Sequence, residues 1–277
     1  MNKERMRHTA LVALILVLAV LCGIKIAGRR ARLREYEEMQ AAAASAAAET
    51  EAYVPVAEGV PETEAPAPRD EYAERVIDFA SLKKRNEDVV AWIFIPDTVI
   101  DYPVLYKRGD NEYYLHRDID RASSYNGIYL DADDEPDMSC WQNVFYGHHM
   151  KNGSMFTAIC SFKDEAFFRE HQRVYLYTPD HTYILKPMAC LYTDASAEKR
   201  RVKFEDRLEF SAYAEKMTRG CSFRELPEGG IDRLFSFVTC SYEFNNARTI
   251  LYCSEVDAGG VPVAPAETLT KEGSTES

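Results

Sequence analysis

The stretch LFSFVTC, from Leu234 to Cys240, determines how the rest of the chain is interpreted. Its mixture of β-branched and aromatic residues is typical of a buried strand, here one that ends at a cysteine. A second strand is predicted at ARTILY, from Ala247 to Tyr252. The connection between the two is short enough for antiparallel neighbours. We therefore expect the guanidinium of Arg248 to lie beside the Cys240 thiol.

Upstream, NVFYGHHM from Asn143 to Met150 predicts a strand that runs into a glycine and two histidines. A thiol nucleophile needs an imidazole for proton transfer and a cation for the oxyanion, and this chain offers a source of each. If the strand continues through Gly147, His148 and His149 point to opposite sides, so only one can face the thiol.

Three segments together resemble the class B sortases, membrane-anchored cysteine transpeptidases of Gram-positive bacteria. They are VFYGHHMKNGSMF (144–156), FVTC (237–240) and SYEFNNAR (241–248). The similarity covers roughly 70–254 and includes WIFIPDTVIDYPVL, NEYYLHRD and NGIYLD. It implies that His148, Cys240 and Arg248 are the catalytic residues, and it selects His148 over His149.

Three further residues near these motifs are predicted to contact substrate, namely Tyr146, Thr239 and Glu243. Pairing with Arg248 is the alternative role for Glu243, the acidic residue nearest to it in the sequence. A metal site built from Cys140, His148 and His149 is the structural rival. Its spacing fits no common zinc motif, so we expect no metal.

The resemblance implies cleavage of a C-terminal sorting motif of the Asn-Pro-x-Thr-Gly type after its threonine. A thioester intermediate then passes the acyl group to a peptidoglycan precursor amine, without a cofactor. Three alternatives stay open. They are a pilin-polymerising sortase that uses a pilin lysine as acceptor, a hydrolytic cysteine peptidase, and a catalytically silent, membrane-tethered binding module.

The chain is predicted to be mainly β with helical additions, because many short strands alternate with turn residues, as in a closed barrel or sandwich. Strands are expected at 91–95, 99–105, 127–131, 143–147, 173–178, 183–192, 232–239 and 248–252. Helices are expected at 70–85, 164–171 and 206–219. The resemblance implies an eight-stranded sortase-type β-barrel, with an N-terminal helix and a helix before the cysteine strand.

The N-terminal region predicts a membrane anchor. Residues 9–24 carry no charge, and 9–28 is long enough to span a bilayer. A cleaved signal peptide is the alternative, although no Ala-x-Ala site follows the apolar core. Three Lys or Arg precede the uncharged run 9–24 and five follow it by residue 34, which favours a cytoplasmic C-terminal domain. The resemblance implies the reverse orientation, with the catalytic domain outside a single-pass cell-membrane anchor.

Composition divides the remainder of the chain. Residues 1–8 form the expected cytoplasmic N-terminus, and 29–69 a basic, then Ala-rich, then acidic and Pro-rich stalk. The predicted catalytic domain covers 70–256, and 257–277 is a flexible tail. The net charge of −12 argues against a nucleic-acid partner, while the juxtamembrane arginines suit anionic lipid.

Seven cysteines without a CxxC pair argue against a disulfide framework. Five of them are expected to be small buried hydrophobes, Cys140, Cys160, Cys190, Cys221 and Cys253.

Overall fold

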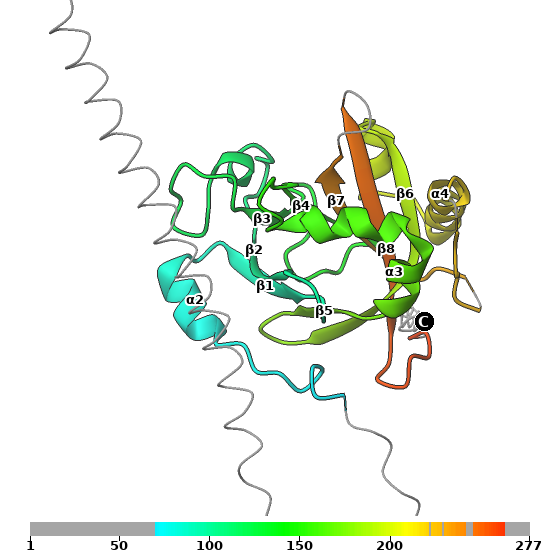
Figure 1. The fold of residues 1–277 in the computed structure, drawn as a ribbon, viewed down its shortest axis with the longest axis horizontal. Helices are drawn as coiled ribbons and strands as arrows, with labels where there is room; N and C mark the ends of the chain where they lie inside the picture. The colour runs from blue at the N-terminus through cyan, green and yellow to red at the C-terminus, as the bar shows by residue number, and fades with distance from the viewer. Residues whose placement is uncertain (1–69, 222, 229, 242–245, 264–277) are drawn as a thin grey trace, which may run out of the picture. The chain divides into compact units, whose positions relative to one another are not determined.

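The computed structural model describes residues 70–263, except for 222, 229 and 242–245 (Figure 1). The predicted N-terminus, anchor and stalk (1–69) lie outside the described residues, as does 264–277 of the predicted tail. Within the described part, no helix has the length and apolar character needed to cross a bilayer.

Eight strands form a closed barrel in the order β1-β2-β3-β4-β7-β8-β6-β5. Their bounds are β1 Val89–Phe94, β2 Asp101–Leu105, β3 Ile128–Leu130, β4 Gln142–Gly147, β5 Val174–Tyr177, β6 Thr182–Asp194, β7 Leu234–Cys240 and β8 Ala247–Val256. The pairs β2–β3 and β4–β7 are parallel, and the other six are antiparallel. The predicted fold class is confirmed, and each predicted strand corresponds to one of these eight.

One helix, α2, precedes the first strand, and the other helices lie in connections between strands. They are α2 Phe79–Arg85, α3 Glu165–Glu170 and α4 Arg207–Arg219, with the 3₁₀ helices η1 Tyr114–His116, η2 Phe156–Lys163 and η3 Ala197–Arg200. The Asp206 carboxylate accepts a hydrogen bond from Glu209 N, which confirms the predicted cap of α4. In a capping box, the Glu209 side chain would in turn accept a hydrogen bond from the backbone N–H of Asp206. Here it accepts from Glu205 N, one residue earlier.

The predicted helix over 70–85 is wrong in its first half, since α2 begins only at Phe79. Tertiary contacts hold the earlier residues in turns and extended backbone. The Tyr175 hydroxyl donates to the Asp70 carboxylate at 2.8 Å, and the Tyr177 hydroxyl donates to the Tyr72 carbonyl at 2.6 Å. These contacts with β5 override a weak local preference for helix.

Aromatic side chains fill the barrel around the end of β4. The Phe145 and Phe237 rings stack with centroids 5.0 Å apart, and Phe156 of η2 meets Phe237 edge-on at 6.1 Å. On the other face of the sheet, the apolar side of α4 packs against residues of β6, β7 and β8. Figure 1 shows this helix beside β6. The catalytic-strand candidate β7 is therefore fixed on both of its faces.

The six described cysteines are free thiols. Cys190 and Cys253 are buried as predicted, whereas Cys140, Cys160 and Cys221 are only half-buried. Burial raises the pKa of Cys140 to about 11 and that of Cys221 to about 12. These two thiols stay protonated at neutral pH and are poor nucleophiles.

Candidate active site

Cys240 and Arg248 lie directly opposite each other on the antiparallel strands β7 and β8. Ser241 N donates to Ala247 O at 3.0 Å, so the next pair along the ladder, Cys240 with Arg248, is a non-hydrogen-bonded one. Residues in non-hydrogen-bonded pairs lie closer together than residues in hydrogen-bonded pairs, with Cα atoms about 4.5 Å apart. Cys240 and Arg248 are therefore cross-strand neighbours on one face of the ladder.

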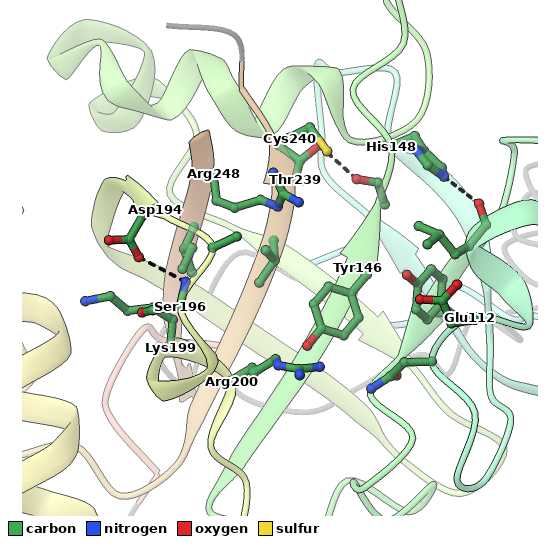
Figure 2. Close-up of a pocket in the computed structure, with 17 residues that line it drawn as sticks. Glu112, Tyr146, His148, Asp194, Ser196, Lys199, Arg200, Thr239, Cys240 and Arg248 are labelled. Atoms are coloured by element: carbon green, nitrogen blue, oxygen red, sulfur yellow. Dashed lines mark hydrogen bonds between the residues drawn. The ribbon is translucent and has the colours of Figure 1, made fainter. Parts of the chain in front are cut away.

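Within the part of the chain that the structure describes, Arg248 makes one hydrogen bond and no ion pair. One Nη1 donates to the Ala247 carbonyl at 2.9 Å. Among the described residues, no carboxylate lies within ion-pair distance of its guanidinium. Figure 2 shows the side chain reaching from β8 toward Thr239 and Cys240. A guanidinium carries five N–H donors, so it can stabilise the oxyanion of a carbonyl that the thiol attacks.

The end of β4 is fastened to β7 one residue before Cys240. The Thr239 hydroxyl donates to Gly147 O at 2.8 Å, and Thr239 is buried. The packing of η2 requires glycine at position 147, because a Cβ there would lie 2.5 Å from the Phe156 ring. Strand β4 therefore ends in contact with η2, and His148, the next residue, points toward the site.

His148 is held by η1. Its Nε2–H donates to Leu115 O at 2.7 Å, which leaves Nδ1 as the proton acceptor of the neutral ring. Burial lowers the pKa of His148; the Leu115 bond opposes this, and the charges of His116 and Arg248 add to the lowering. Tyr125 packs edge-on against the imidazole at 5.1 Å.

One cavity of about 260 Å³ brings the predicted residues together. Five of them line it, Tyr146, His148, Thr239, Cys240 and Arg248 (Figure 2). The sixth, Glu243, lies outside the described residues. Two members of the rival metal site contact different backbone carbonyls, His148 that of Leu115 and His149 that of Cys240.

Tyr146 forms part of the cavity wall. Its hydroxyl donates to the buried carboxylate of Asp131 at 2.6 Å, and its ring lies 5.3 Å from that of Tyr129. Burial and the Asp131 charge raise the pKa of both tyrosines, so both stay neutral. Figure 2 shows Glu112 and Arg200 on opposite sides of Tyr146.

Several cavity residues were missed by sequence reasoning. They are Asn111, Glu112, Leu115, Tyr129, Asp194, Ala195, Ser196, Lys199, Arg200, Val238 and Ile250, besides Gly147. The first three belong to the NEYYLHRD segment, whose similarity to the family was the available signal. Lys199 and Arg200 come from η3, where only a basic pair in a connection marked them.

Known proteins share sequence and fold with this chain. No family model matches the chain. The chain is 29% identical to sortase B of Listeria monocytogenes over 168 residues, covering 60% of this chain and 68% of that protein. It is 25% identical to sortase B of Staphylococcus aureus over 164 residues, covering 58% and 67%. The crystal structure of Clostridium perfringens sortase B matches with a TM-score of 0.59 and 30% identity, over 64% of this chain and 99% of that one.

The chain belongs to the class B sortases. It is accordingly a sortase-type cysteine transpeptidase, and its barrel is the sortase fold. Within the described residues, no group of three or more His, Cys, Asp or Glu side chains is placed to hold a metal ion.

Proposed function

We propose that this sortase cleaves a C-terminal sorting motif of the Asn-Pro-x-Thr-Gly type after its threonine and transfers the acyl group to a cell-wall amine. The observation that carries the proposal is the direct cross-strand pairing of Cys240 with Arg248 at a cavity that His148 also lines. Acyl transfer needs a nucleophile, a proton carrier and an oxyanion donor, and these three residues are of the required kinds.

In the first step, the Cys240 thiolate attacks the threonine carbonyl carbon, and a C–S bond forms. The carbonyl oxygen becomes an oxyanion, which the guanidinium of Arg248 stabilises. When the tetrahedral intermediate collapses, the C–N bond breaks and the imidazolium of His148 gives its proton to the departing amine. The product of this step is a thioester between Cys240 and the threonine.

In the second step, an incoming amine attacks the thioester carbonyl and transfers its proton to the now neutral His148. The C–S bond breaks, and Cys240 is released as a thiolate, while a new amide bond forms. His148 is thereby returned to its cationic state for the next cycle. The lowered pKa of His148 makes the cationic form a minority at neutral pH, so the active pairing of charges is a minor state.

The proposed partners are those that the resemblance to sortases implies. The substrate is a surface-protein sorting signal, and the acceptor is an amine of a peptidoglycan precursor. Solved structures of sortase B include a Staphylococcus aureus substrate complex and a complex with triglycine, which supports both classes of ligand. We place the active site on the extracytoplasmic side of the membrane, held there by 9–28, since wall precursors and surface proteins lie on that side.

A peptide assay tests the proposal. The chain is mixed with an Asn-Pro-Gln-Thr-Gly peptide, and intact mass spectrometry follows the acyl-enzyme. We expect a covalent adduct on Cys240 that hydroxylamine releases, and no adduct on Cys240→Ala. Triglycine and a lysine-containing pilin peptide are then offered as acceptors. Absence of any adduct with peptides of this class would contradict the proposed substrate, and faster transfer to the lysine peptide would point to pilus assembly.

A further inference from the structure

His149, the histidine that the predicted mechanism does not use, lies against the backbone of the nucleophile. Its Nδ1 is 3.1 Å from the carbonyl oxygen of Cys240. A carbonyl oxygen only accepts hydrogen bonds, so Nδ1 carries the proton and donates it. The two adjacent histidines therefore serve different targets: His148 bonds a carbonyl of η1, and His149 bonds the carbonyl of the cysteine itself.

The local strand geometry explains why this carbonyl needs a side-chain donor. Cys240 and Arg248 form a non-hydrogen-bonded pair, so the Cys240 carbonyl points away from β8 and toward the β4 side. The parallel register of β4 with β7 ends at Tyr146 and Val238, two residues before Cys240. The imidazole of His149 takes the position in which a continued β4 would offer a main-chain N–H.

A second thiol completes this contact. The Cys160 Sγ lies 3.4 Å from His149 Nδ1, 3.7 Å from the Cys240 carbonyl oxygen and 3.6 Å from Thr249 Oγ1. Cys160 belongs to η2, which packs against β7 and β8. The half-buried imidazole is thus held between η2 and the end of β7, where its orientation is fixed.

We propose that His149 is a positioning residue for the nucleophile. Its Nδ1–H fixes the peptide plane that follows Cys240 and so keeps the Cα–Cβ bond of Cys240 aimed at the Arg248 side of the cavity. The inference rests on the proposed role of Cys240 as nucleophile. Orientation matters at this position because a displacement of about 1 Å at a reacting group can cost 10²-fold in rate.

Two substitutions of His149 separate positioning from simple stability. His149→Ala removes the donor, and we expect kcat to fall about tenfold with KM unchanged. The Nδ2–H of asparagine occupies the position of Nδ1–H, so His149→Asn should restore kcat to within about threefold of wild type. The rate at which iodoacetamide alkylates Cys240, followed on its peptide by mass spectrometry, should change in the same order.

His171 provides a matched control. It is also half-buried, and its Nδ1 also bonds a backbone carbonyl, that of Phe167 at 2.8 Å, on α3. His171→Ala should leave kcat and Cys240 alkylation unchanged even if it lowers the unfolding midpoint. The inference is overturned if His149→Ala equals wild type, if His149→Asn is as impaired as His149→Ala, or if both alanine variants lose activity alike. In each case an inactive Cys240→Ala leaves the proposed function standing.

Discussion

The Leu115 carbonyl accepts the Nε2–H of His148 at 2.7 Å, and this bond couples the NEYYLH segment to the proposed proton carrier. It fixes which ring nitrogen carries the proton in the neutral state and leaves Nδ1 to exchange protons. Leu115 lies 33 residues upstream of His148, and its own side chain carries no ionisable group. The tautomer is therefore set by a backbone atom, which substitution of the Leu115 side chain cannot remove.

The lowered pKa of His148 predicts a pH-dependent contribution to stability. Between this lowered pKa and the ordinary value of 6.5, the unfolded chain binds more protons than the folded one. The free energy of unfolding should therefore fall as pH decreases below about 6.5, through the lowered pKa. The variant His148→Gln has no ionisable side chain at this position, so it lacks this contribution to the pH dependence of stability. Urea denaturation of both proteins from pH 8 to 5 should show wild type losing stability relative to the variant. A difference that is constant with pH would contradict the prediction.

Removal of the Arg248 guanidinium should impair turnover more than binding. Arg248→Ala is expected to lower kcat by about 10²–10³-fold, as for loss of an oxyanion donor. Arg248→Lys should recover little, because an ammonium lacks the planar fork. Peptide cleavage kinetics measure both effects. Arg169→Ala, at an exposed arginine bonded to Glu165, is the control and should remain at wild-type activity. A fully active Arg248→Lys would show that charge alone is required.

Gly147 should tolerate no side chain. A Cβ at this position meets the Phe156 ring at 2.5 Å, so Gly147→Ala forces η2 or the end of β4 to move. We expect a loss of about 1–3 kcal/mol in the free energy of unfolding, together with reduced activity from displaced histidines. In Gly220→Ala the new Cβ would find only Leu191 at 3.4 Å, and stability should change by about 0.5 kcal/mol or less. Equal effects of the two substitutions in denaturant titrations would refute this account.

The N-terminal boundary of the folded domain is predicted to lie close to Asp70. A fragment of residues 66–263 should unfold at the same temperature as the full chain, since it keeps the Asp70 and Tyr72 contacts with β5. A fragment of 78–263 loses them and the Arg75–Asp101 ion pair, and its midpoint should drop by several degrees, about 2–4 °C for each kcal/mol lost. Scanning calorimetry compares the three. A 66–263 fragment that does not fold would place the boundary further upstream.

The strands were predictable because their signal is local. Alternation and β-branched or aromatic runs mark each of them, and the short connection after Cys240 already implied its pairing with Arg248. The conformation of residues 70–78 was not predictable in this way. Their apolar spacing fits a helix. However, two hydroxyl groups about a hundred residues later hold this segment in another conformation: Tyr175 binds the carboxylate of Asp70, and Tyr177 binds the carbonyl of Tyr72.

The candidate site also has one part that the local sequence predicts and another part that it does not. His148, Cys240 and Arg248 stand in motifs that a resemblance can transfer residue by residue. The contact of His149 with the Cys240 carbonyl depends on where β4 stops relative to β7, which the packing of Phe156 on Gly147 decides. Arg200 reaches the cavity because Gln142 holds the nearby backbone, its Nε2 donating to the Arg201 carbonyl at 2.9 Å. Such long-range placement has no local signature.

The parallel pairing of β4 with β7 has a consequence for biogenesis. The two strands are separated by the whole of η2 to α4, so the imidazole and the thiol meet only when a long loop closes, which is a slow and entropically costly event. A nascent or partly folded chain thus carries an isolated cysteine and an isolated histidine, neither competent for acyl transfer. If Cys240 and His148 act as proposed, peptide cleavage during refolding should recover only after β4 and β7 have paired.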